Sequence, residues 1–281
     1  MLGDAVERES AERRTTSSIR ALILILGAIL LSAGCSGSQR AGGADPVRQS
    51  ESEYDLARDL WLRRGQVREA LEHALRAVDL DDENSEAFHL VALLYLDFCA
   101  RSPAECRLKD AEKAARRALS LKPDFREARN TLGVVLIHQQ RPRDAIAVLK
   151  PLSEDILYGT PEKAWGNLGW AYFEAGEVDR AIDALRRSIA AQPLFCVGSF
   201  RLGLAYERRA EFASALAAFS RALETNAPEC AQLQDAWWGR ARVAERLGQT
   251  DSIRADLERC VELSSSTGTG KNCRSMLDKL K

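Results

Sequence analysis

The sequence lacks an excess of charge of either sign. Its 40 Lys and Arg residues balance 41 Asp and Glu residues, so the formal net charge is −1 over 281 residues. Nucleic-acid binding depends on many contacts from a basic surface to phosphates, so this balance argues against a nucleic-acid partner. Histidine is scarce, with three scattered residues, and no C-x-x-C pair is present. Because zinc sites need clustered Cys and His ligands, we expect no metal and no cofactor.

Motifs that carry catalysis are also missing. The chain has no G-x-S-x-G elbow, no H-E-x-x-H helix and no G-x-G-x-x-G after a strand. The stretch TGTGK, residues 267–271, is similar to a phosphate-binding loop. It has Ser265 where such a loop needs its first glycine, and Asn272 where it needs Ser or Thr. We interpret it as a flexible hinge and predict that the protein is not an enzyme and has no small-molecule substrate.

No apolar run is long enough to cross a membrane as a helix. The apolar stretch 21–31 has eleven residues, whereas a spanning helix needs about 20. It follows the basic Arg20 and ends in the sequence LSAGC, whose last residue is Cys35. This arrangement is typical of a secretory signal. It resembles the lipobox of bacterial lipoproteins, although Ser32 stands where that family usually has Leu. We therefore expect residues 1–34 to be a lipoprotein signal peptide and Cys35 to carry the lipid.

Residues 36–50 are rich in Gly, Ser and Ala and contain one Pro. Such a composition cannot bury enough apolar surface to fold, so we interpret 35–50 as a flexible tether that follows the lipidated cysteine. Ser36, and not Asp, comes after Cys35. The resemblance to Gram-negative lipoproteins implies a lipid anchor in the outer membrane, with the folded part on the periplasmic face.

The rest of the chain is an array of similar segments about 34 residues long. The clearest copy is 162–193, in which Gly169 and Ala181 are small where two antiparallel helices would cross closely. Gly176 is suited to end the first helix, and Pro193 to stop the second. With these residues, Trp165, Leu168, Tyr172 and Leu185 complete the spacing of the tetratricopeptide repeat.

Five further copies fit the same register, and recurrence is what makes the pattern specific. They begin at Glu51, Ser85, Arg126, Cys196 and, after four extra residues, Gln234. We predict an all-α fold, a tetratricopeptide repeat solenoid of about six helical hairpins over 51–267, followed by a C-terminal segment, 268–281. The aromatic and leucine residues of the repeat pattern are expected to pack the hairpins together and not to bind a ligand.

A candidate protein-binding groove follows from the geometry of stacked hairpins. In such an array the first helices line a concave surface, and their positions opposite the hairpin core are apolar in four successive copies. We expect this stripe to bind a polypeptide, the alternative being that the C-terminal helix or neighbouring side chains fill it. Lys and Asn pairs that would clamp a C-terminal carboxylate are missing there. The predicted groove residues are Leu93, Leu96, Asn130, Val134, Ile137, Trp170, Phe173, Phe200 and Leu204.

Six of the seven cysteines remain if Cys35 is lipidated. An exported chain enters an oxidising compartment, so disulfides are expected, and six cysteines allow 15 pairings. Proximity favours Cys99 with Cys106 across an insertion in the second copy. Register favours Cys196 with Cys230 on neighbouring repeats. Cys260 and Cys273 can tie the C-terminal segment back, the alternative for Cys260 being a small core residue.

A narrower resemblance appears in residues 148–176, VLKPLSEDILYGTPEKAWGNLGWAYFEAG. This stretch looks like part of the type IV pilus pilotin lipoproteins, the PilF/PilW/Tgl group, which carry six tetratricopeptide repeats after a lipobox. The resemblance implies an outer-membrane scaffold that helps a PilQ-like secretin subunit to multimerise by binding it in the groove. The insertion with Cys99 and Cys106 departs from the shorter members. The alternative function is a periplasmic adaptor lipoprotein for peptidoglycan enzymes or proteases.

Overall fold

The computed structural model describes residues 45–224, 228–249 and 252–280. The predicted signal peptide 1–34, the lipidation site Cys35 and the tether as far as residue 44 lie outside the described residues. Helices and turns make up the described ranges, which contain no strand. None of the helices in these ranges combines the length and hydropathy that crossing a bilayer requires.

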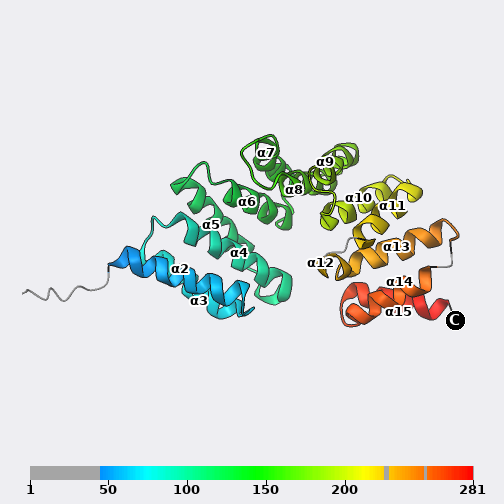
Figure 1. Cartoon of the computed structure of the whole chain (residues 1–281), viewed down its shortest axis with the longest axis horizontal. Coiled ribbons are helices and arrows are strands. Elements are labelled where there is room, and N and C mark those ends of the chain that lie inside the picture. The colour runs from blue at the N-terminus through cyan, green and yellow to red at the C-terminus, as the bar shows by residue number, and fades with distance from the viewer. Residues whose placement is uncertain (1–44, 225–227, 250–251, 281) are drawn as a thin grey trace, which may run out of the picture. The chain divides into compact units, whose positions relative to one another are not determined.

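Six antiparallel helical hairpins follow one another along the chain (Figure 1). Each first helix packs on the second helix of its own hairpin, and consecutive first helices contact each other. This arrangement confirms the prediction of an all-α tetratricopeptide repeat array. The hairpins are α2 (Pro46–Leu62) with α3 (Val67–Leu80), α4 (Ser85–Arg101) with α5 (Leu108–Leu121), α6 (Arg126–His138) with α7 (Pro142–Ser153), α8 (Pro161–Glu174) with α9 (Val178–Ala191), α10 (Cys196–Arg208) with α11 (Phe212–Glu224), and α13 (Gln234–Arg246) with α14 (Ile253–Leu263).

Three further helices lie outside the hairpin pattern. A 3-10 turn, η1 (Pro103–Glu105), occupies the insertion between α4 and α5, and the short α12 (Pro228–Ala231) precedes α13. The last helix, α15 (Gly268–Lys279), packs on α14 and α13. The interpretation of residues 267–271 as a flexible hinge is therefore wrong. The Thr267 side chain accepts a hydrogen bond from the Gly270 N–H at 2.9 Å, which caps the helix and uses the Thr-Gly stretch as its first turn.

The first hairpin begins earlier than the tether prediction allows. Helix α2 starts at Pro46, so residues 46–50 belong to the fold and not to the tether. Proline is well suited to the first turn of a helix, because its missing N–H has no partner there in any case. Ser50 is fully buried, and its hydroxyl donates to the Ala77 carbonyl oxygen of α3 at 2.8 Å. The mostly polar composition of residues 46–50 does not predict this contact.

Five of the six hairpin turns share one backbone conformation, and the exception is the turn between α4 and α5 that holds the insertion. After the first helix, one residue takes a positive φ, and the next N–H bonds back to a carbonyl in the helix's last turn. In the fourth hairpin this residue is Gly176, with φ 80°, as the sequence predicts. The equivalent residue is a non-glycine in two turns. The five positions are Gly65, Gln140, Gly176, Ala210 and Gly248.

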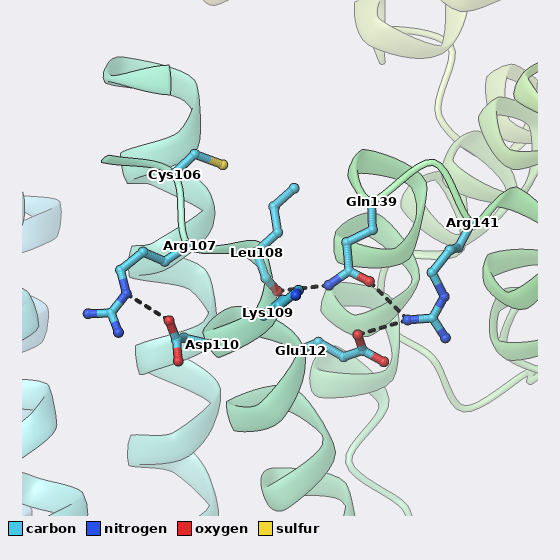
Figure 2. A pocket seen from close by; sticks show the side chains of 8 residues that line it. All are labelled: Cys106, Arg107, Leu108, Lys109, Asp110, Glu112, Gln139 and Arg141. Atoms are coloured by element: carbon cyan, nitrogen blue, oxygen red, sulfur yellow. Dashed lines mark hydrogen bonds and ion pairs between the residues drawn. The ribbon is translucent and has the colours of Figure 1, made fainter. Parts of the chain in front are cut away.

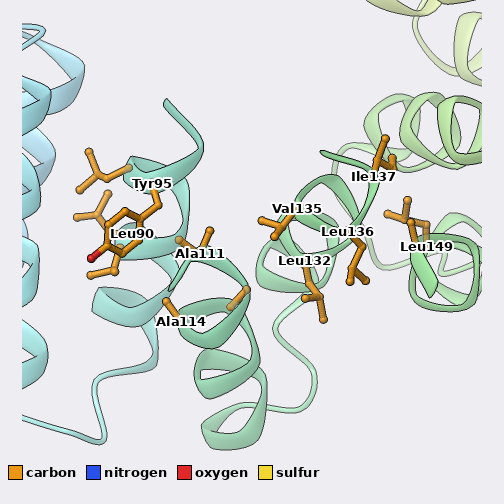
Figure 3. Packing of buried hydrophobic residues seen from close by; sticks show 14 of the residues in the cluster. Leu90, Tyr95, Ala111, Ala114, Leu132, Val135, Leu136, Ile137 and Leu149 are labelled. Atoms are coloured by element: carbon orange, nitrogen blue, oxygen red, sulfur yellow. The ribbon is translucent and has the colours of Figure 1, made fainter. Parts of the chain in front are cut away.

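Small residues let the two helices of each hairpin approach closely. A Cβ atom on Gly169 would lie 2.6 Å from Cγ of Leu185, so no larger side chain fits there without displacing the leucine. Alanines of the second helices are likewise fully buried at the crossings, for example Ala111 and Ala145. Figure 3 shows part of the same core, with Leu132 and Leu136 on α6 and Leu149 on α7. The small residues that recur in the repeat pattern are therefore explained by the close packing of helices.

Three disulfides link the six cysteines of the described ranges. Cys99 pairs with Cys106 across η1, with 4.2 Å between their Cα atoms. Cys196 at the start of α10 pairs with Cys230 of α12, and Cys260 of α14 pairs with Cys273 of α15. The second bond closes a 34-residue span and the third ties α15 to the last hairpin.

Candidate protein-binding face

The nine predicted groove residues lie on four consecutive first helices. Leu93 and Leu96 are on α4, and Phe200 and Leu204 are on α10. Because α4, α6, α8 and α10 contact one another in series, these residues form one surface, which we call the first-helix face. The members on the two middle helices are Asn130, Val134 and Ile137 of α6 and Trp170 and Phe173 of α8.

This face is less open than an exposed apolar stripe would be. Ile137 is 4% exposed and Phe173 is 7% exposed, so both belong to the core. The other seven residues are half-buried, and none of the nine is among the exposed large hydrophobic residues. The structure thus supports part of the alternative in which neighbouring side chains fill the stripe, because the guanidinium groups of Arg201 and Arg208 lie over the rings of Trp170 and Phe173.

The centre of the face is an aromatic pair flanked by arginines. The rings of Trp170 and Phe173 are stacked, with centroids 5.0 Å apart. The Arg201 guanidinium lies 5.5 Å from the Trp170 ring centroid, and that of Arg208 lies 4.3 Å from the Phe173 centroid. Both arginines belong to α10, seven residues apart, which places them on one side of the helix. Sequence reasoning missed them because it searched for apolar residues. Arg201 stands three residues before Leu204 and Arg208 four residues after it, and this helical spacing could have predicted that both lie beside the face.

A short polar network connects three first helices under this pair. Nη1 of Arg201 donates to the Gly166 carbonyl oxygen at 3.1 Å and to Oδ1 of Asn167 at 2.8 Å. Asn167 in turn donates through Nδ2 to Oδ1 of Asn130 at 3.0 Å. Asn167 is 9% exposed, so these bonds satisfy a buried amide. The network holds the Arg201 side chain in place across the α8 and α10 contact.

Arg201 has no acidic partner within the described ranges. Other half-buried arginines do: Arg240 pairs with Asp256 at 2.6 Å, and Arg242 with Glu207 at 2.5 Å. Around Arg201 the hydrogen-bond acceptors are neutral, and burial lowers the pKa of its guanidinium to about 10. The group stays charged at neutral pH, and the cost of removing it from water is not offset by an anion.

His89 lies at the α4 end of the face, where its Nε2 is 2.9 Å from Oγ1 of Thr131. The Thr131 hydroxyl donates to the Glu127 carbonyl oxygen, so it accepts from a neutral imidazole. The ring also packs edge-on against Phe125. Burial lowers the pKa of His89 to about 4. These contacts give His89 a structural role.

A separate cavity of about 770 Å³ lies beside the insertion, between the start of α5 and the end of α6. Four of its charged groups are paired with one another, as Figure 2 shows: Arg107 with Asp110 at 2.7 Å, and Arg141 with Glu112 at 2.9 Å. The amide of Gln139 donates to the Leu108 carbonyl oxygen at 3.0 Å. This arrangement stabilises the joint between two hairpins. Among the described residues, no group of three or more His, Cys, Asp or Glu side chains could hold a metal ion.

Comparison with known proteins agrees with this architecture. Family models of the tetratricopeptide repeat match residues 107–151, 162–195 and 200–259. A BBSome complex member BBS4 homolog of Drosophila melanogaster is 24% identical over 280 residues, and the type IV pilus assembly protein PilF of Pseudomonas aeruginosa is 26% identical over 169 residues. These alignments cover 93% and 57% of this chain. The chain spans 54% of the length of the first relative and 63% of the second.

Two solved structures share the fold over nearly their whole length. The crystal structure of PilW, a type IV pilus biogenesis factor, has a TM-score of 0.65 at 22% identity and covers 79% of this chain and 97% of its own. The structure of Pseudomonas aeruginosa PilF has a TM-score of 0.62 at 16% identity, covering 83% and 100%. The chain is therefore a tetratricopeptide repeat protein, with the fold found in the type IV pilus proteins PilW and PilF.

Proposed function

We propose that this protein is a lipid-anchored scaffold of the outer membrane that binds the secretin subunit of a type IV pilus and promotes its assembly into multimers. The observation that carries the proposal is the first-helix face, whose residues on α4, α6, α8 and α10 are mostly apolar and mostly half-buried. Tetratricopeptide repeat arrays are protein-interaction modules, and such a face suits an extended or helical segment of a partner.

The relatives support a partner that belongs to a type IV pilus. PilW and PilF are named for type IV pilus biogenesis and assembly, and the fold of this chain covers 97% and 100% of their solved structures. The lipobox-like sequence that ends at Cys35 supports an anchor on the periplasmic face of the outer membrane. A tethered scaffold would raise the local concentration of secretin subunits at the membrane where they assemble, without making or breaking a bond.

The experiment is a chromosomal deletion in the source bacterium, complemented with variants of the face. Heat-resistant secretin multimers are scored against monomers by immunoblotting. Leu204→Glu places a charge on the face, and we expect it to reduce multimers strongly while the purified variant still melts cooperatively. Leu194→Glu is the matched control, because Leu194 is 66% exposed in the turn before α10 and outside the face.

Phe173 is a poor probe of this function. It is 7% exposed and belongs to the core, so truncation to alanine would cost about 3–5 kcal/mol of folding free energy and would test folding instead of binding.

Unchanged multimers in the deletion strain, or in Leu204→Glu, would refute the secretin role. Cross-linked membranes that yield a peptidoglycan hydrolase and no secretin would favour the adaptor function. A Cys35→Ser variant tests the anchor through its loss from the membrane fraction.

A further inference from the structure

We propose that the first-helix face recognises a partner segment through one of its acidic side chains, which Arg201 binds beside the Trp170 and Phe173 pair. The inference rests on the proposed function only in taking this face as a polypeptide-binding surface. It adds the chemistry of the partner: an Asp or Glu flanked by apolar residues.

The Arg201 guanidinium has one edge whose N–H groups are not used by the other described residues. Its Nη1 is used by Gly166 and Asn167, and within the described ranges Nε and Nη2 have no acceptor. The Nε and Nη2 donors of an arginine form a planar fork that matches both oxygens of a carboxylate. The Asn167 contact fixes the guanidinium, so little side-chain entropy remains to be lost when an anion binds.

The charge around the aromatic pair is positive and would attract an acidic side chain. Arg208 adds a positive charge two helical turns along α10, and it too has no ion pair with a carboxylate in the described ranges. Glu207, between them in sequence, is already held by Arg242, at 2.7 Å from Nε to Oε1. Glu207 is therefore held by another arginine, and two positive groups remain beside the aromatic pair.

The position of Arg201 within the face suits an acidic side chain better than a chain terminus. Apolar residues of the face lie one turn further along α10, at Leu204, and on the first helix beyond α8, at Val134 of α6. A bound segment can thus extend past Arg201 in both directions, which a C-terminal carboxylate does not require. Apolar side chains next to the acidic residue would contact Trp170 and Leu204, and their burial would exclude water from the ion pair.

The test uses the purified full chain without its signal peptide and a displayed library of random short peptides. We expect wild-type protein to select peptides enriched in Asp or Glu next to apolar residues, and Arg201→Met to lose that enrichment. The control is Arg187→Met. Arg187 of α9, a second helix, lies 4.7 Å from the Trp165 ring, so this variant also removes an arginine that covers a tryptophan, but outside the first-helix face. Thermal melts of both variants verify folding, and Arg208→Met supplies an exposed second variant on the face.

Selected peptides are then synthesised with the acidic residue changed to its amide. We expect this change to weaken binding to wild-type protein about 10- to 100-fold and to leave binding to Arg201→Met unaltered. Binding to wild-type protein should also weaken between about 50 and about 500 mM salt. Recovery of no binding peptide, of binders indifferent to the amide change, or of binders that need a free C-terminal carboxylate would overturn the inference.

The two proposals fail separately. Acid-dependent peptides that bind Arg201 support the recognition chemistry whether or not secretin multimers depend on the protein. Multimers that depend on Leu204 but not on Arg201, together with peptide binders that lack an acidic residue, would support the scaffold and overturn the carboxylate site.

Discussion

The phenyl ring of Phe219 fills the space that Gly203 leaves open, so that a Cβ atom on the glycine would lie 2.6 Å from Cδ1 of the ring. Gly239 of the next repeat faces the same ring, with 2.7 Å from its Cβ position to Cε1. Phe219 is fully buried, and one aromatic side chain thus joins two consecutive first helices, α10 and α13, to α11. The contact between these repeats depends on glycine at both positions.

Gly203→Ala should destabilise the protein by about 1–3 kcal/mol, because the added methyl group cannot be accommodated without moving the Phe219 ring. Urea unfolding measures the change. Gly268→Ala is the control, since nothing lies within 4 Å of its Cβ position. The combination of Gly203→Ala with Phe219→Leu should be less destabilising than the sum of the two single changes, and strict additivity would count against a direct contact.

Ala210→Gly should raise the free energy of unfolding by about 0.5–1 kcal/mol. Ala210 holds φ at 60° in the turn after α10, a conformation that costs a non-glycine residue about 1–2 kcal/mol, and glycine's greater freedom in the unfolded chain offsets part of the gain. Gly176→Ala makes the reverse change at φ 80°, where no neighbouring atom crowds the Cβ position. It should lower stability, and equal signs for the two variants would contradict the explanation.

Stability should fall as the pH is lowered from about 6.5 towards 4, through His89. Its pKa is about 4 in the folded protein, against 6.5 for a histidine in water, so the unfolded chain binds the proton first and folding is favoured above 6.5. The full difference is worth about 3 kcal/mol, with a slope of at most about 1.4 kcal/mol per pH unit. Urea titrations at successive pH values measure it.

His89→Gln keeps a hydrogen-bond donor for Thr131 and removes the titration, so its pH dependence should be shallower in this window. Partial desolvation and the charge of Arg201 also lower the pKa of His138, which adds to the same slope. His138→Gln therefore serves as the second variant. A wild-type profile that stays flat from pH 6.5 to 4.5 would show that His89 is protonated in the folded state.

Loss of the Cys260–Cys273 bond should release α15 without unfolding the array. The bond closes a 13-residue span, and a loop of this size contributes about 3 kcal/mol by the chain-entropy relation. Hydrogen exchange of residues 268–279 in Cys273→Ser should become faster, while α8 and α10 keep their protection. The pair Cys99→Ser with Cys106→Ser should leave α15 unaffected. Global unfolding of Cys273→Ser would mean that the last hairpin depends on α15.

The sequence by itself determined the hairpins and their register. Gly169, Ala181 and Gly176 occupy positions whose requirements are local, namely close helix crossing and a left-handed turn, and these recur at a fixed spacing that can be read without the fold. The same periodicity predicted which helices carry Leu93, Val134, Trp170 and Leu204, because one position in each repeat always faces the same way.

Only the tertiary structure decided which of these residues are accessible and which charges are paired. Phe173 is buried in the core. Ser50 near the start of the fold and Thr267 near its end both form hydrogen bonds to residues far away in the sequence, so the folded region extends further at both ends than the composition indicates. Glu207 pairs with Arg242, which is 35 residues away, and this leaves Arg201 without an acidic partner in the described part of the chain. Burial and ion pairing depend on contacts between repeats, and those depend on the packing of whole helices.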